Sequence, residues 1–180
     1  MKIEEQPMNK KDFSRNCLSQ ALIELLEDNE YEDISIQDIV DKAGFSRMAY
    51  YRNFKDKNEI IDYCLDNMFD TFIAKTDISY ARMGPERFFE TMFKIFSDDE
   101  MVKITKLLLK RGLIGAIANQ FVKRVQGGFI PNQSRYFYDF LAGGFFAVYL
   151  AWINNGLKET PEEMTKEAMK YVNYLREKGV

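Results

Sequence analysis

Apolar residues recur at intervals of three and four along nearly the whole chain, and the alternation of apolar and polar residues that marks a strand is almost absent. This spacing places apolar side chains on one face of an α-helix. In the segment 10–28, for example, the residues on one face are Phe13, Cys17, Ala21, Leu22 and Leu25. The pattern predicts an all-α fold with about nine helices.

Capping residues divide this pattern into separate helices. Ser35, with Asp38 three residues later, is typical of a helix start, and Gly44 is expected to end that helix after two turns. Ser46 can cap a third helix that ends near Asn53, and a long fourth helix is expected next. Further starts and ends are predicted at Gly84-Pro85, at Ser97 with Glu100, in the loop 127–133, at Ser134, at Gly156, and at Thr160-Pro161 with Glu163. Gly112 and Gly115 are expected to make either a break or a close contact within 98–126.

The composition excludes several classes of protein. The chain has 180 residues, 46% of them hydrophobic and 29% charged, an ordinary balance for one or two globular domains. It has no histidine, which excludes Ser-His-Asp and Cys-His triads and most zinc sites that use histidine. No pair of carboxylates lies beside a nucleophile or metal ligands in a recognisable spacing. We therefore expect no catalytic site, no metal and no cofactor.

Two features bear on the compartment. Cys17 and Cys64 lie far apart in apolar helical patterns, which favours buried free thiols in a reducing compartment, with a disulfide between them as the alternative. Residues 1–9 lack the layout of a signal peptide, so we expect a cytoplasmic protein.

The apolar run from Phe140 to Ile153 is shorter than the roughly 20 residues that cross a bilayer. It predicts a helix buried on most sides, and no membrane association.

The segment AGFSRMAYYRNFKDK, from Ala43 to Lys57, mixes aromatic and basic residues closely. Two short helices joined by a glycine turn are the layout of a helix-turn-helix, whose second helix lies in the major groove of DNA. Since the net charge of the chain is −3, any binding to DNA must come from local positive charge of this kind. Many such helical corners bind nothing, so the layout alone leaves a purely structural role open.

Helical spacing divides this segment into an inner and an outer face. The residues expected to face the core are Phe45, Ala49 and Phe54. Those expected on the outside are Arg47, Met48, Tyr51 and Arg52. Arginine can bind guanine edges and methionine can pack on a thymine methyl, whereas tyrosine hydroxyls and lysine ammonium groups can reach phosphates. The candidate DNA-contacting residues are therefore Ser46, Arg47, Met48, Tyr51, Arg52, Asn53, Lys55 and Lys57.

Residues 10–75 resemble the DNA-binding domain of the TetR family of bacterial transcription regulators. The resemblance rests on the runs SIQDIVDKAGFS, YYRNF and KDKNEII. It implies phosphate contacts by Tyr51 and Lys57 and inward packing of Tyr50 and Phe54. The residues it implies at the bases are Arg47, Met48 and Arg52. Asn53 departs from the aromatic residue or histidine that is frequent in the family, so its role stays open between reading adenine and capping the helix.

The resemblance implies a homodimeric transcription regulator. We expect a repressor that binds a near-palindromic double-stranded DNA operator and releases it when a small-molecule effector binds. The helix-turn-helix domain is expected over 1–57 and a helical ligand-binding and dimerisation domain over 58–180, linked through a helix over 56–75. Two alternatives stay open: a DNA-binding protein of the same fold without an inducer, and a small-molecule binding protein or enzyme with a vestigial helix-turn-helix.

The second half is rich in large apolar side chains, which can form a ligand pocket or a packed core. We expect a mainly apolar ligand, lined by some of Phe69, Phe89, Met92, Phe93, Phe121, Phe137 and Tyr149. Dimerisation is expected through the helices 135–156 and 161–177, because Gly143 and Gly144 permit close approach of helices. The last helix is expected to add Met164, Ala168, Tyr171, Val172 and Leu175.

Overall fold

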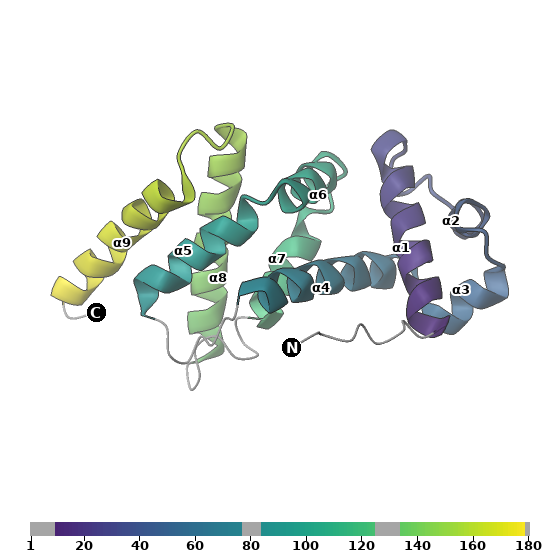
Figure 1. Ribbon diagram of the computed structural model, residues 1–180, viewed down its shortest axis with the longest axis horizontal. Helices are drawn as coiled ribbons and strands as arrows, with labels where there is room; N and C mark the ends of the chain where they lie inside the picture. Colours follow the sequence, from purple (N-terminus) through teal and green to yellow (C-terminus); the bar gives the residue numbers. More distant parts are fainter. Residues whose placement is uncertain (1–9, 77–83, 125–133, 179–180) are drawn as a thin grey trace, which may run out of the picture. The chain divides into compact units, whose positions relative to one another are not determined.

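The computed structural model describes residues 10–76, 84–124 and 134–178, and these form nine α-helices without a strand (Figure 1). In chain order the helices are α1 (Lys10–Asp28), α2 (Ile36–Ala43), α3 (Arg47–Asn53), α4 (Lys57–Thr76), α5 (Pro85–Phe96), α6 (Asp99–Lys110), α7 (Ile114–Arg124), α8 (Arg135–Asn154) and α9 (Pro161–Glu177). The predicted all-α fold is confirmed, and the helix ends follow the predicted ones closely. The predicted loop 127–133 lies outside the described residues.

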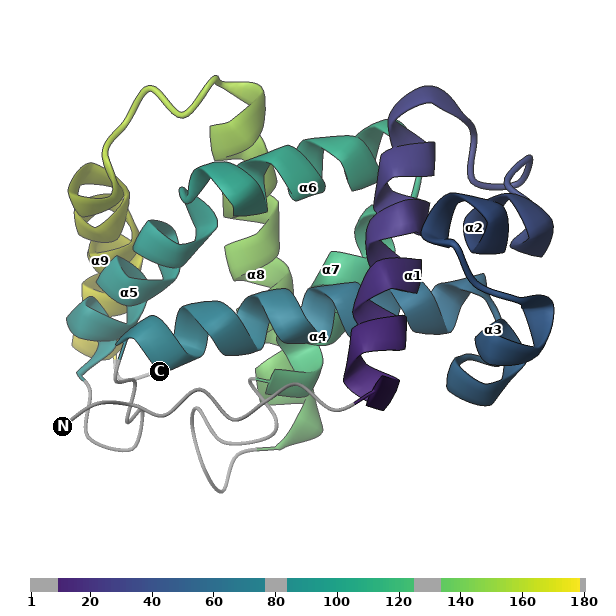
Figure 2. The same ribbon diagram turned by 45° about the vertical axis from the view of Figure 1, so that its right-hand side comes forward.

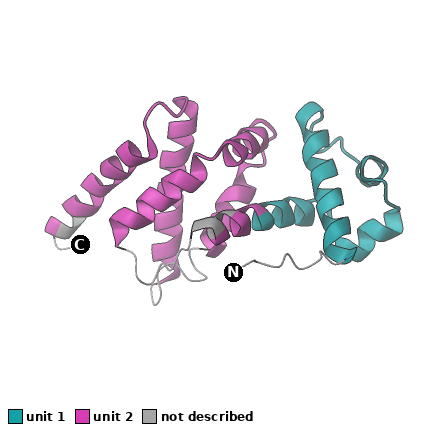
Figure 3. Cartoon of the chain, in the orientation of Figure 1, with its two compact units in different colours: residues 1–67 teal, residues 68–180 magenta. Residues whose placement is uncertain are grey.

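Contacts within the chain divide it into two units, residues 1–67 and residues 68–180 (Figure 3). The boundary falls within α4, later than the sequence-based boundary at residue 57. The first part of α4 belongs to the N-terminal unit because it is bonded to α1. The Tyr63 hydroxyl and the Asn67 amide both donate hydrogen bonds to Oδ1 of Asn16, at 2.7 Å and 3.2 Å.

In the N-terminal unit, α1, α2 and α3 pack against one another around one small core (Figure 2). The apolar positions of α1 that share a helical face supply one side of this core, and α2, α3 and the start of α4 supply the rest. Its most buried side chains are Leu18, Leu22, Leu26, Ile39, Val40, Tyr50, Phe54 and Ile60. Cys17 and Cys64 are free and half-buried.

Local signals set the two short helices of this unit. Ser35 and Asp38 form the predicted capping box at the start of α2, and the hydrogen bonds from Ser35 lower the pKa of the Asp38 carboxyl. Gly44 ends α2 with a φ of 72°, a left-handed conformation that glycine adopts without a steric cost. The next amide, of Phe45, donates to the Val40 carbonyl at 2.9 Å. Ser46 then caps α3 by accepting from the Ala49 amide at 3.2 Å.

In the C-terminal unit, aromatic rings pack against one another between α5, α6, α7 and α8. Phe96 lies at the centre, with its ring 4.5 Å from that of Tyr149, 5.2 Å from Phe145 and 5.5 Å from Phe121. The Tyr149 hydroxyl donates to the Thr105 hydroxyl at 3.0 Å, and burial raises the pKa of this tyrosine. This unit therefore has a packed aromatic core in which Tyr149 and Thr105 form a buried polar pair.

Two predicted helix boundaries in the C-terminal unit need correction. The cap of α6 is Asp98, whose carboxylate accepts from the Glu100 amide at 3.0 Å, whereas Ser97 instead donates to the Lys94 carbonyl. Gly112, with a φ of 70°, separates α6 from α7, but Gly115 lies within α7. The capping box predicted at the start of α9 is present.

The prediction that the apolar helix is buried on most sides is wrong. One face of α8 is buried and carries Tyr138, Ala142, Phe145, Phe146, Tyr149, Trp152 and Ile153. On the other face Tyr136 is 83% exposed and Phe140 is 76% exposed. Within the described residues, α8 is the helix long and apolar enough by composition to cross a membrane, and such a helix is also found in soluble cores. A single subunit covers only one side of it.

Candidate DNA-binding surface

The outer face of α3 carries the four side chains that helical spacing predicts there. Arg47 and Arg52 are exposed, and Met48 and Tyr51 are 74% and 56% exposed. Tyr50, between them in sequence, is fully buried. An exposed thioether and phenol beside two guanidinium groups are side chains that can contact base edges and phosphates.

The charge on this face is unneutralised. Among the described residues, no carboxylate forms an ion pair with Arg47 or Arg52. Lys55, just beyond α3, has a side chain 89% exposed and a long ion pair of 3.7 Å with Glu59. An exposed pair of this length is weak and leaves the ammonium available to a phosphate.

Asn53 has a structural role that sequence reasoning left open. Its side-chain amide donates to the Ala49 carbonyl at 2.7 Å and to the Ser14 hydroxyl at 3.2 Å. The amide thus ties the end of α3 to α1. A base contact by Asn53 stays a prediction. Its side chain bonds to α1 and α3, whereas Arg47 and Arg52 are exposed on the outer face.

Lys57 also lies differently from what the resemblance implies. It is half-buried, and its ammonium donates hydrogen bonds to the backbone carbonyls of Tyr31 and Ile34. Two of the three ammonium hydrogens thus already have acceptors within the chain. The contact of Lys57 with a phosphate stays a prediction.

Sequence reasoning missed the part that α1 takes in holding this unit together. The Arg15 guanidinium lies 4.0 Å from the centre of the Tyr63 ring and 5.0 Å from that of Phe54, so one cation contacts two rings. The sequence does contain a signal for this contact. Arg15 lies on the same helical face as the apolar residues Leu18 and Leu22, where a positive charge needs a partner within the fold.

Tyr50 is buried beneath the outer face, in contact with the Tyr51 ring at 5.2 Å. Its hydroxyl has no hydrogen-bond partner in the part of the chain that the structure describes. Burial, with the carboxylate of Asp56 as a second cause, raises the pKa of Tyr50 to about 12. The same two causes raise the pKa of Tyr31 to about 12.

The residues predicted to line a ligand pocket are mostly within the aromatic core. Phe69, Met92, Phe93, Phe121 and Tyr149 are buried, and Phe89 is half-buried against Phe93, with 6.3 Å between ring centres. Phe137, by contrast, is 37% exposed. The structure therefore places most of these residues in the core, where Phe89 contacts Phe93 and the rings of Phe69, Phe121 and Tyr149 each contact Phe96.

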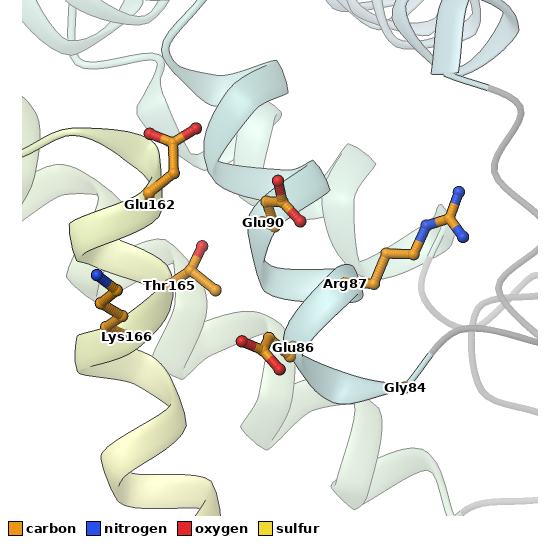
Figure 4. Close-up of a pocket in the computed structure, with 7 residues that line it drawn as sticks. All are labelled: Gly84, Glu86, Arg87, Glu90, Glu162, Thr165 and Lys166. Carbon is orange, nitrogen blue, oxygen red and sulfur yellow. The ribbon is translucent and has the colours of Figure 1, made fainter.

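Two surface grooves lie elsewhere in the C-terminal unit, and neither is lined by a predicted ligand residue. The first, of about 490 Å³, runs between the start of α5 and α9 and is lined mainly by charged side chains (Figure 4): Gly84, Glu86, Arg87, Glu90, Glu162, Thr165 and Lys166. The second, of about 450 Å³, lies between α8 and α9, and its lining includes the buried Trp152 and Met164. No group of acidic residues or cysteines suited to a metal occurs among the described residues.

The predicted dimer residues divide between the surface and the interior. Gly143 and Gly144 are exposed, and an added Cβ at either would meet nothing within 4 Å. Met164 is buried within the subunit, where α9 packs on α5, and Tyr171 is 64% exposed. Ala168 and Val172 are half-buried. The side chain of Leu175 lies outside the described residues.

A basic, exposed α3 that follows α2 across a glycine turn and is braced by α1 defines a helix-turn-helix protein of the DNA-binding kind. The family pattern described as "Bacterial regulatory proteins, tetR family" matches residues 18–64. A second, described as "Transcriptional regulator C-terminal region", matches residues 85–174, half of the chain. The chain belongs to the TetR family of bacterial transcription regulators, and it is a regulator rather than an enzyme.

Known proteins are similar to this chain in sequence over part of its length, and others in fold. The HTH-type dhaKLM operon transcriptional activator DhaS of Lactococcus lactis is 27% identical over 74 residues, which cover 41% of this chain and only 40% of that relative. Lin0861 from Listeria innocua has a similar structure over 94% of this chain and 96% of its own, with a TM-score of 0.74 and 15% identity. A TetR regulator from Streptococcus agalactiae has a TM-score of 0.62 and 18% identity over 91% of this chain and 95% of its own.

Proposed function

We propose that this protein is a homodimeric repressor that binds a near-palindromic operator through α3 of each subunit. The observation that carries the proposal is the outer face of α3, where Arg47 and Arg52 have no acidic partner beside the exposed Met48. Two unpaired guanidinium groups and a thioether on one helix face match the edges of guanine and the methyl of thymine. Lys55 and Tyr51 lie on the flanks, where phosphates are expected.

A second copy of the chain is the partner we propose for the exposed face of α8. Tyr136, Phe140, Gly143, Gly144 and Val148 give this face an apolar character that a monomer in water does not stabilise. The two glycines at mid-helix allow the backbones of two such helices to approach closely. A two-fold pair would also present two α3 helices, as a near-palindromic site requires.

We further propose that a small, mainly apolar molecule binds in the C-terminal unit and weakens binding to DNA. The support is the family membership together with the cluster of large aromatic side chains around Phe93 and Tyr149. Such a ligand can act only if it binds one state of the protein more tightly than the other.

The close packing of that cluster favours a second candidate function. Phe93 and Phe121 are almost fully buried, and each lies within about 5 Å of the Phe145 ring. Rings in contact with one another leave no space for an inducer between them. The second candidate is therefore a regulator without an inducer, whose activity changes through its own concentration or through a protein partner.

Selection of binding sites from random double-stranded DNA tests the proposed function. We expect enrichment of a sequence with two-fold symmetry, bound at least about a thousandfold more tightly than random duplex. Transcription in vitro from a promoter that carries this site then distinguishes repression from activation. Equal binding to selected and random DNA would contradict the proposal. A screen of small apolar molecules for release of the selected duplex separates the first candidate from the second.

A further inference from the structure

Lys57 begins α4, but its side chain turns back toward the segment between α1 and α2. Its ammonium donates hydrogen bonds to the backbone carbonyls of Tyr31 and Ile34, the second at 2.7 Å. The same nitrogen lies 4.3 Å from the centre of the Tyr31 ring. Both carbonyls lie outside the helices, so the ammonium satisfies two acceptors that no helical amide reaches.

These contacts join the two ends of the helix-turn-helix. Ile34 directly precedes Ser35, the cap of α2, and Lys57 follows the short segment 54–56 that ends α3. The bond between Lys57 and Ile34 therefore closes a ring of backbone that contains all of α2 and α3. Closing a loop of this length removes many conformations from it.

A second bond supports the same closure from the other side. The Tyr31 hydroxyl donates to Oδ1 of Asn58, the residue after Lys57, at 2.9 Å. The linker before α2 is thus attached to the first turn of α4 by both a charged and a neutral contact. Gly44 makes the turn between α2 and α3, and the contacts of Lys57 connect the chain before α2 to the chain after α3.

We infer that Lys57 is a positioning residue, whose ammonium closes the helix-turn-helix and sets the angle at which α3 is presented to DNA. This inference rests on the proposed DNA-binding function. It differs from the phosphate contact that resemblance to the family implies, because an ammonium that donates to two carbonyls keeps only one hydrogen for another acceptor.

Lys57→Met tests the inference, since methionine keeps an apolar stem but removes the charge and the three donors. Lys55→Met is the matched control, two residues away, because the Lys55 side chain is 89% exposed and takes no part in the contacts with Tyr31 and Ile34. Amide hydrogen exchange of α3, measured without DNA, should rise about tenfold in Lys57→Met, as expected for a lost charge-assisted hydrogen bond, and stay unchanged in Lys55→Met. Lys57→Arg, which can donate to both carbonyls, should restore slow exchange.

Binding to the selected operator at several salt concentrations supplies the second measurement. Lys57→Met should lower operator affinity about tenfold, in line with the exchange result, without changing the dependence on salt. Unchanged exchange in α3 would overturn the inference, as would a salt slope lowered by about one unit per subunit. The exchange measurement uses no DNA. Failure of the wild-type protein to select a duplex would therefore count against the proposed function, and exchange would still decide the role of Lys57.

Discussion

At the scale of single residues, Arg47 carries the sharpest expectation. It lies exposed in the first turn of α3, from which side chains reach base edges in helix-turn-helix proteins. We expect Arg47→Ala to lower operator affinity by about 1–3 kcal/mol and to blur the preference at one position of each half-site. Fluorescence anisotropy on the operator, and on duplexes changed at single base pairs, measures both effects.

The control for this prediction is Arg87→Ala, which removes another exposed arginine from α5 in the other unit. It should leave operator affinity unchanged. If Arg47→Ala weakened operator and random duplex equally, Arg47 would be a backbone contact, and Met48 and Arg52 would have to read the bases.

Tyr50→Phe is expected not to destabilise the protein. The Tyr50 hydroxyl is buried without a hydrogen-bond partner in the described structure, a condition that costs about 1–3 kcal/mol for a polar group. Removing it should leave the free energy of unfolding unchanged or raise it, as measured by denaturant titration. Tyr149→Phe is the comparison and should lower that free energy, because it loses the hydrogen bond to Thr105. A clear loss of stability in Tyr50→Phe would reveal a partner for its hydroxyl.

The raised pKa values predict loss of stability in alkali. The pKa of both Tyr31 and Tyr50 is raised from 10.0 to about 12, so above pH 10 the unfolded chain loses phenolic protons that the folded chain keeps. The folded state then binds more protons, and the free energy of unfolding falls as pH rises. The contribution is complete below about pH 10 and is lost as pH rises through about 12. Denaturant titrations at several alkaline pH values should show this decline, and a shallower one in Tyr50→Phe.

The sequence predicted the outer face of α3 but not the carbonyl contacts of Lys57. For Asn53 it left two roles open, and the hydrogen bonds to Ala49 and Ser14 fit the role at the helix end. Exposure of Arg47 and Met48 follows from helical spacing, which is a local property. The contacts of Lys57 depend on where the chain before α2 returns to α4, more than twenty residues away in sequence. A long flexible side chain can reach a phosphate or a carbonyl, and only the fold decides between them.

At the scale of elements, α3 depends on the turn that precedes it. Gly44 has a φ of 72°, and an added Cβ would meet nothing within 4 Å, so Gly44→Ala changes backbone strain without a clash. We expect it to lower the free energy of unfolding by about 1–2 kcal/mol. Gly115→Ala, in α7 with similarly open surroundings, should instead raise it by about 0.5–1 kcal/mol. Thermal unfolding of both variants checks this; equal effects would show that the turn is not strained.

Helix starts and ends were largely predictable because capping is a local interaction. Ser35, Ser46, Ser134 and Thr160 all cap the helices expected of them. Burial of α8 was not predictable, because an apolar run without a polar stripe gives no indication of which face meets the core. For the same reason, ligand and core residues in the second half could not be told apart.

At the scale of the whole molecule, pairing of two chains through α8 can be tested without disturbing the fold of one chain. Gly144→Leu places a large side chain where the subunit itself offers open space. We expect the variant to keep its helical content but to sediment as a monomer at micromolar concentration, because the leucine holds two α8 helices apart. The wild-type protein should sediment as a dimer.

Gly115→Leu, on an exposed glycine of α7, is the control for a leucine in open space and should leave the dimer intact. A wild-type chain that sediments as a monomer would count directly against the proposed pairing. A dimeric Gly144→Leu would place the contact between chains on another face.

Under the proposed pairing, the exposed face of α8 makes the regulator respond to its own supply. Two chains must meet before two α3 helices can hold one operator. While most chains are single, the amount of paired protein rises with about the square of the total. A cell that makes half as much of this protein would then hold about a quarter as much of its DNA-binding form. The genes it controls would respond to how much regulator is made, whether or not an effector is present.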